Sequence, residues 1–199
     1  MNGVAFRFLP ALILVAYFAH RAYYFRKVRH ASGTVAEQPR EPAAALGLSR
    51  AVLTLAANVV YVAAPQWMRW ASWPLQAWLR WTGLALAFAA FALLEWCHAA
   101  LGRNWSGRVR LLKDHELVAS GPYRWVRHPM YTAGLLANLS VLLLSANWLV
   151  GGSWLLMHGW QFALRIPLEE GLMVNQFGDT YRQYMRTTGR LLPRLGHRG

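Results

Sequence analysis

Cysteine is nearly absent from this chain, whose single thiol, Cys97, lies inside an apolar run. One cysteine excludes an internal disulfide and a cysteine-based zinc cluster. We expect Cys97 to be buried and unreactive, since cysteine in apolar surroundings packs as a small hydrophobic residue. The sequence therefore predicts neither a disulfide-stabilised fold nor a metal site.

Acidic residues are also scarce, with 8 Asp and Glu against 21 Lys and Arg and a formal net charge of +13. Yet 56% of the residues are hydrophobic, and a soluble domain is not normally both this apolar and this basic. Because the basic residues lie in short blocks between apolar stretches, we expect them to face the headgroups of membrane lipids. This pattern argues against a nucleic-acid partner, and nothing in it indicates an obligate protein partner.

Five apolar stretches match the length that crosses a hydrocarbon core about 30 Å thick. They cover residues 4–25, 43–64, 75–101, 129–146 and 148–167. We therefore predict an all-α integral membrane protein, with one domain over residues 1–199 and five transmembrane helices. A loop over residues 102–128 and an amphipathic helix over residues 169–188 complete the prediction.

The basic end of the first stretch orients this arrangement. By the positive-inside rule that end is cytoplasmic, so the N-terminus lies outside and, with five spans, the C-terminus lies in the cytoplasm. We expect a retained anchor, since no small-residue cleavage site follows the stretch, and a bacterial inner membrane as the location. Five spans bring the loop over residues 102–128 to the same side as Arg165, Glu169 and Glu170, whereas an even number would separate them.

Three local features predict how the helices pack. The segment between the second and third stretches carries three tryptophans, which is typical of a loop at the lipid headgroups. The fourth and fifth stretches would form a tight hairpin around Asn147. Gly151, Gly152 and Gly159 would let the partner helix approach closely.

Glu95, near the inner end of the third stretch, is either an interhelical contact or part of a site.

A polar, turn-rich passage over residues 115–131, here called the passage, leads into the fourth stretch. A turn at Gly121 would expose backbone hydrogen-bonding groups beside Leu117, Val118 and Tyr123. Apolar cover and a backbone edge together suit an adenine or a ribose. Pro129 is placed to begin a helix, and a helix N-terminus favours a negative group such as a carboxylate.

Charged residues near this passage suit a zwitterionic ligand. Arg165 or His128 would bind its carboxylate, and Glu169 would bind its ammonium group, while Arg127 adds positive charge. Each residue also has a simpler explanation. Arg124 and Arg127 would bind lipid phosphates, His128 would cap a helix, and the glutamates would begin a solvated helix. The residue types alone leave these alternatives open.

Five ordered blocks resemble a known family. They are LGRNWS (101–106), HELV (115–118), GPYRWVRHPMY (121–131), RIPLEE (165–170) and FGDTYRQY (177–184). Each block is weak alone, but their combination is similar to the isoprenylcysteine carboxyl methyltransferase family, and related membrane phospholipid methyltransferases share part of it. The resemblance covers about residues 101–193.

The resemblance implies a membrane enzyme that uses S-adenosylmethionine to methylate a lipophilic acceptor, with a carboxylate as the first acceptor to consider. The C-terminal segment would close the pocket. Residues implied in cofactor binding are His115, Glu116, Leu117, Val118, Gly121, Tyr123, His128, Pro129, Met130, Tyr131, Glu169 and Glu170. Arg165 would orient the acceptor, and Arg127 is the second candidate for that role.

Two departures and several rivals accompany this resemblance. Gly134 comes three residues after Tyr131 where the family usually has Tyr-x-Gly, and Arg108 replaces a family glutamine. One rival is a methyltransferase acting on nitrogen or sulfur of a phospholipid or small molecule. Another is an NADPH-dependent reductase of the sterol type, although those usually have asparagine in place of Met130. The third is a non-enzymatic lipid-binding membrane protein.

Overall fold

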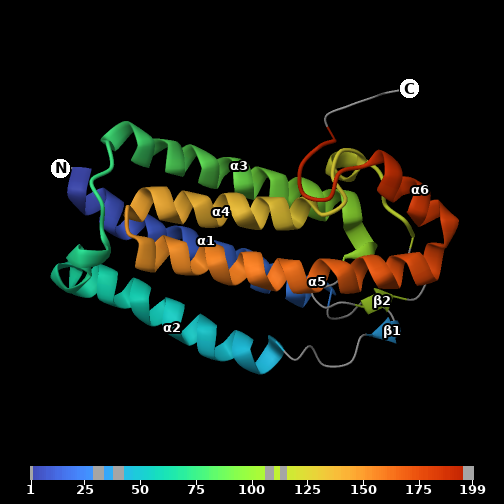
Figure 1. Ribbon diagram of the computed structural model, residues 1–199, viewed down its shortest axis with the longest axis horizontal. Coiled ribbons are helices and arrows are strands. Elements are labelled where there is room, and N and C mark those ends of the chain that lie inside the picture. Colours follow the sequence, from blue (N-terminus) through green and yellow to red (C-terminus); the bar gives the residue numbers. More distant parts are fainter. Residues whose placement is uncertain (1, 29–33, 38–42, 106–109, 113–115, 195–199) are drawn as a thin grey trace.

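The computed structural model describes residues 2–28, 34–37, 43–105, 110–112 and 116–194. Within these ranges the chain is mainly helical, as predicted. The long helices are α1 (Asn2–Val28), α2 (Ala43–Ala63), α3 (Ala77–Leu101), α4 (Pro129–Ser145) and α5 (Ser153–Phe177). Figure 1 shows them running lengthwise in alternating directions, with the short α6 (Asp179–Thr187) at one end.

Two of these helices are long and apolar enough, by length and composition, to cross a membrane, over Gly3–Lys27 and Ala77–Asn104. Both carry exposed apolar side chains, such as Val15 at 66% exposure on α1 and Phe88 at 69% on α3. Lipid accounts for such side chains, because apolar surface is stable in a hydrocarbon core. The structure therefore supports membrane character, and the count of five spans stays a prediction.

A small sheet joins two segments that lie between the predicted helices. Strand β1 (Thr34–Glu37) pairs antiparallel with β2 (Arg110–Leu112), with Thr34 opposite Leu112 and Glu37 opposite Arg110. Strands of three and four residues are too short to show the alternation that identifies a strand in a sequence. The all-α prediction is therefore incomplete at this one place in the described residues.

Helix α5 differs from the predicted boundary between a fifth span and a C-terminal helix. It continues through Pro167 to Phe177, after a π-helical turn, η4 (Trp148–Gly152). The chain then turns at Gly178, whose φ of 53° lies in the left-handed region that favours glycine. A single helix over residues 169–188 was the wrong prediction, because proline favours a helix end without requiring one.

In the hairpin between α4 and α5, one of the three predicted glycines allows the close helix approach. A Cβ added to Gly151 would lie 2.2 Å from the Cα of Leu142, so only glycine permits this approach. The same prediction is wrong for Gly159, where an added Cβ would meet nothing within 4 Å. At Gly152 an added Cβ would make only an ordinary contact, 3.8 Å from Trp148 Cβ.

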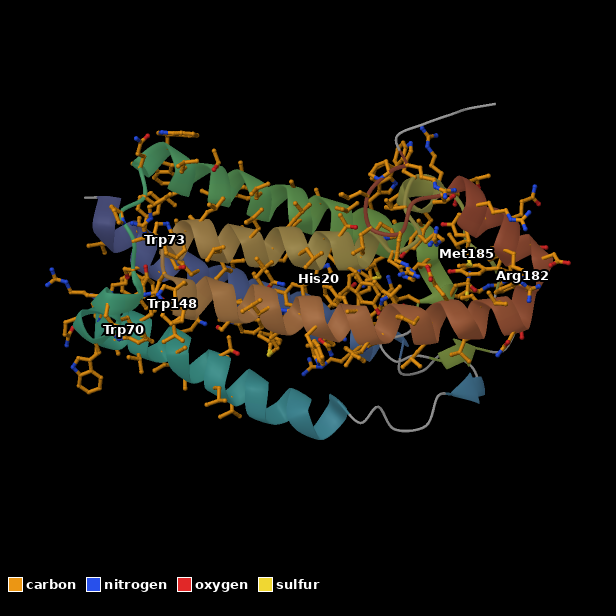
Figure 2. All side chains as sticks on the ribbon, viewed as in Figure 1. His20, Trp70, Trp73, Trp148, Arg182 and Met185 are labelled. Carbon is orange, nitrogen blue, oxygen red and sulfur yellow. The ribbon has the colours of Figure 1, made fainter. Side chains whose placement is uncertain are left out.

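Asn147 organises this end of the molecule, here called the hairpin end. Its fully buried side-chain amide donates to Met68 O and Ser72 Oγ, both at 2.9 Å. Its Oδ1 accepts from the backbone N–H groups of Leu149 and Val150, at 3.1 and 3.0 Å. Figure 2 shows Trp70, Trp73 and Trp148 together at the hairpin end. The tryptophan-rich segment forms a 3-10 helix, η1 (Pro65–Ala71).

Candidate functional site

The opposite end, here called the site end, is where the polar passage, the last turns of α5 and the last described residues meet. The passage turns through η3 (Gly121–Arg124) and enters α4 at Pro129. A Cβ at Gly121 would lie 3.1 Å from Ala100 Cβ and 3.2 Å from Trp96 Nε1, and the φ of 57° is left-handed. The predicted turn is confirmed, and its glycine is required by both conformation and packing.

Residues 188–194, here called the C-terminal strap, lie along this passage. The backbone N–H of Arg127 donates to Gly189 O at 2.8 Å, and that of His128 donates to Arg190 O at 3.1 Å. These bonds tie the tail to the start of α4. The charge pattern predicts the tail on this side of the protein but not this pairing, because main-chain hydrogen bonds require no particular side chains.

Glu170 is the buried centre of the site end, with a side chain 6% exposed. Its Oε1 accepts from Arg127 Nε at 3.0 Å and lies 3.2 Å from His128 Nε2, while its Oε2 accepts from Arg190 Nη2 at 2.6 Å. Burial raises the pKa of Glu170, but the hydrogen bonds from these three residues outweigh burial and lower the pKa to about 2. Glu170 is therefore charged at neutral pH and joins α5 to the passage and the strap.

Glu169 has a different environment, although it is the adjacent residue. Its carboxylate accepts from the Tyr131 hydroxyl and from Arg165 Nη2 at 3.3 Å, and lies 3.7 Å from His128 Nδ1. Its side chain is 26% exposed, against 6% for Glu170. The site end therefore contains one enclosed carboxylate and one that keeps access to a ligand, with His128 between them.

Arg127 is enclosed as well, with a side chain 8% exposed. Its Nη1 donates to Met185 O at 3.1 Å and to Thr188 O, so the residue connects the passage to α6 and the strap. This burial contradicts a lipid-phosphate role for Arg127. Arg124 is exposed, and its guanidinium lies 4.1 Å from the ring centre of Trp125.

Two tyrosines pack between η3 and α6. Tyr123 is buried, and its carbonyl accepts from the Tyr184 hydroxyl at 2.5 Å. Burial raises the pKa of Tyr123 well above its usual value and raises that of Tyr184 to about 12. Both phenols therefore remain protonated at neutral pH. Among the other predicted cofactor residues, Leu117, Val118 and Met130 are half-buried and Pro129 is buried.

Glu116 lies at the edge of this arrangement. Its exposed carboxylate accepts from Arg103 Nη2 at 2.6 Å, and its backbone N–H donates to Asn104 Oδ1 at 2.9 Å. Glu116 therefore lies where the passage begins, and its contact with the cofactor stays a prediction. His115 and Arg108 lie outside the described residues.

The structure brings the passage and α5 together as the charge pattern predicted, and it places Glu95 elsewhere. The Glu95 carboxylate contacts His20 Nε2 at 2.6 Å and the Tyr24 hydroxyl at 2.7 Å, which links α3 to α1. Of the two predicted alternatives, the interhelical contact is the one observed. Cys97 is fully buried, as predicted. No cluster of His, Cys, Asp or Glu suited to a metal ion occurs among the described residues.

Comparison with known proteins gives matches in sequence. Residues 82–175 match the model of the isoprenylcysteine carboxyl methyltransferase family. The protein-S-isoprenylcysteine O-methyltransferase of Tribolium castaneum is 29% identical over 118 residues, which are 58% of this chain and 42% of that protein. The protein of the same name from Schizosaccharomyces pombe is 38% identical over 74 residues, 37% of this chain and 31% of that protein. The chain thus matches less than half the length of either relative.

A solved structure is also similar. The eukaryotic intramembrane Ras methyltransferase ICMT matches with a TM-score of 0.56 and 22% sequence identity, over 78% of this chain and 54% of that one. At this identity the likeness shows a shared fold. It covers more of the chain than either sequence relative above.

Proposed function

Because the chain belongs to the isoprenylcysteine carboxyl methyltransferase family, we propose that it is a membrane methyltransferase that uses S-adenosylmethionine. Its acceptor would be a lipophilic molecule that reaches the site from the bilayer, with a carboxylate as the group methylated. The observation that carries the proposal is the pair of adjacent glutamates, of which Glu170 is enclosed by two arginines and a histidine and Glu169 is accessible beside Arg165.

The site end suits the amino-acid part of this cofactor. S-adenosylmethionine, when bound, supplies a methyl group on a sulfonium sulfur. Glu169 would bind the ammonium group, since the Tyr131 hydroxyl already holds its carboxylate in place. The N-terminus of α4 at Pro129 would favour the cofactor carboxylate. The other residues proposed for the pocket are His115, Glu116, Leu117, Val118, Gly121, Tyr123, His128 and Met130.

Glu170 would serve the pocket by positioning its neighbours. Its hydrogen bonds hold Arg127 and His128 at the start of α4 and attach Arg190 of the strap. A buried ion pair between this carboxylate and the two arginines is costly to break, so the group keeps a single arrangement. Glu169 therefore keeps a defined position against His128.

Arg165 is the residue we assign to the acceptor carboxylate. It lies on α5 one turn before Glu169, and its side chain is 14% exposed. Arg127, the second candidate, has its guanidinium engaged by Glu170, Met185 O and Thr188 O. A guanidinium matches a carboxylate in shape and charge, so Arg165 would fix the direction of approach.

The proposed chemistry requires little acid–base work from the protein. Displacement at a sulfonium methyl group is in line and its leaving group needs no proton, so most of the acceleration comes from holding the reactants in line at a dry site. A carboxylate acceptor needs no general base. An amine would need one, and Glu169 or His128 would then take the proton.

The proposed topology has five spans, an external N-terminus and a cytoplasmic C-terminus in a bacterial inner membrane. The alternating directions of the five long helices support this count (Figure 1). The last turn of α1 carries Arg26 and Lys27, and α1 ends on the side of the molecule where the site lies. A basic helix end on that side agrees with a cytoplasmic site.

Calorimetric titration of the detergent-purified chain with S-adenosylhomocysteine tests the cofactor. We expect binding, and we expect Glu169→Gln to weaken it about 10- to 100-fold through loss of a charged hydrogen bond. Asp179→Asn, at a side chain 98% exposed in α6, is the matched control and should leave the affinity unchanged. No binding by the unmodified chain would sink the proposal; binding of NADPH instead would indicate the reductase, and binding of neither would indicate the non-enzymatic protein.

Lipid extracts incubated with methyl-labelled S-adenosylmethionine test the acceptor. A carboxyl methyl ester releases labelled methanol on treatment with base, whereas methylated nitrogen or sulfur retains the label. We expect release of methanol. Label that survives base would move the proposal to a phospholipid or small-molecule N- or S-methyltransferase.

A further inference from the structure

An exposed aromatic and basic patch borders the strap on the site end. It consists of Trp96 on α3, Arg124 and Trp125 at the end of the η3 turn, and Leu192 and Arg194 on the strap. Trp96 is 47% exposed, Trp125 is 37% exposed and Leu192 is 73% exposed. None of these residues takes part in the proposed chemistry. Two exposed arginines beside exposed indoles and a leucine form an amphipathic surface that needs a partner.

Contacts between neighbouring residues link the members of this patch. The rings of Trp96 and Trp125 lie 5.4 Å apart in an edge-on arrangement, and Arg124 stacks on Trp125. The Trp125 carbonyl accepts from the N–H of Gly189 at 3.3 Å. A Cβ added to Gly189 would lie 1.8 Å from Leu192 O and 3.1 Å from the backbone nitrogen of Arg194. The strap therefore bends sharply at Gly189 and brings its last residues back to the tryptophans.

The position of Trp96 places this patch at a membrane boundary. Trp78, at the other end of the same helix, is 60% exposed. The 18-residue step from Trp78 to Trp96 corresponds to about 27 Å of helix, close to the thickness of a hydrocarbon core. Exposed tryptophans at this spacing match the two aromatic belts of a membrane protein. The patch then lies level with the lipid headgroups.

We propose that this patch binds the headgroups of anionic phospholipids and that this contact holds the C-terminal strap closed over the site. The charge supports a lipid of this class, because Arg124 and Arg194 are exposed cations and the one acidic residue of α6, Asp179, is paired with Arg182. Leu192 would enter the boundary between headgroups and acyl chains, and the indoles would lie at the same depth.

The strap gives such a contact a route to the site. Gly189 and Arg190 accept hydrogen bonds from the backbone of Arg127 and His128, and the Arg190 side chain binds Glu170. Thr132 on α4 donates to Leu191 O at 2.6 Å. A lipid that stabilises residues 192–194 therefore stabilises the segment that encloses Glu170, and the bound form of the site should become more populated. The inference goes beyond the proposed methyl transfer and does not require it.

A spin label at Leu192→Cys tests the lipid contact without a cofactor. The label is followed by its exposure to oxygen and to a water-soluble nickel chelate, in nanodiscs of phosphatidylcholine alone or with roughly one third phosphatidylglycerol. The unmodified chain, whose Cys97 is fully buried, controls for stray labelling. We expect deeper burial of the label with the anionic lipid. Equal depth in both, or the same change produced by soluble glycerol phosphate, would overturn the proposal.

Affinity for S-adenosylhomocysteine in the same nanodiscs tests the coupling. We expect about threefold to tenfold tighter binding with the anionic lipid, since one basic residue near such a surface contributes about fivefold. The double variant Arg124→Gln with Arg194→Gln should lose this gain, while Arg182→Gln, an exposed arginine on α6, should keep it. A gain retained by the double variant would overturn the coupling. If no lipid supports any binding, the proposed methyltransferase fails, and the spin label still decides the lipid contact.

Discussion

The two ends of the helical bundle provide different hydrogen-bond partners for their arginine side chains. At the site end, Arg127 and Arg190 bind the buried carboxylate of Glu170. At the hairpin end, Arg80 donates through Nε to Leu144 O at 2.9 Å, and Arg7 donates through Nε to Val62 O at 2.6 Å. Both of these carbonyls lie in the last turns of helices. Figure 2 shows the two ends, with Trp70, Trp73 and Trp148 at one and Arg182 and Met185 at the other.

The choice of partner indicates which end is structural and which end could bind a ligand. The last turn of a helix has free carbonyl groups that accept hydrogen bonds from a cationic side chain. The arginines of the hairpin end therefore cap α2 and α4 without a carboxylate. No Asp or Glu occurs in residues 1–36, 42–94 or 129–168. The two adjacent glutamates of α5 therefore differ from the hairpin end, where backbone carbonyls bind the arginines. Local exceptions of this kind are expected at functional sites, and the accessible carboxylate of Glu169 is available to a ligand.

Removal of the enclosed carboxylate should break the site end most strongly. We expect Glu170→Ala to destabilise the protein by about 3 to 5 kcal/mol, because it leaves Arg127 buried without its partner. Thermal unfolding in detergent measures the effect, with Asp179→Asn as the exposed control, expected within about 0.5 kcal/mol of the parent. A change as small as that of the control would mean that Glu170 does not hold this end together.

Removal of the amide at the other end should cost less and leave the site intact. We expect Asn147→Ala to destabilise by about 2 kcal/mol, since it deprives the buried N–H groups of Leu149 and Val150 of their acceptor. Ser72→Ala, which removes one partner of the same amide, should have a smaller effect. Unchanged affinity for S-adenosylhomocysteine would confirm that the two ends are independent, whereas a large loss would show coupling through α4 and α5.

Truncation at the accessible side of the site should affect the acceptor. We expect Arg165→Gln to raise the acceptor KM about tenfold, with the affinity for S-adenosylhomocysteine changed by less than about threefold. Steady-state kinetics and titration on one preparation separate the two quantities. The reverse pattern, weak cofactor binding with a normal KM, would assign Arg165 to the cofactor.

Acid should loosen the site end before the hairpin end. The pKa of Glu170 is about 2 in the folded protein, below its ordinary value of 4.5. Its contribution to stability is therefore complete above about pH 4.5 and is lost as the pH falls toward 2. Amide hydrogen exchange, corrected for intrinsic rates, should show residues 127–128 losing protection in this range while residues 149–151 keep theirs. Equal loss at both ends would contradict a local role for Glu170.

The sequence predicted the helices better than their boundaries, because apolar length identifies the long helices. Through the resemblance the sequence also named Glu169, Glu170 and Arg165, whose roles in a site stay predictions. It misplaced the end of α5 because Pro167 lies within that helix, and it missed β1 and β2 because the strands are too short to carry a pattern. It also missed Arg190, which lies outside every resembling block.

The sequence by itself determined the helical membrane character, the burial of Cys97 and the gathering of charge in one passage and one helix end. These follow from composition and local order along the chain. Only the tertiary structure decided which glutamate is enclosed, that the strap reaches Arg127 and His128, and that Arg124 faces outward while Arg127 does not. Neighbouring residues of the same type differ only in what folding brings beside them, and contacts between distant segments leave no trace in local sequence.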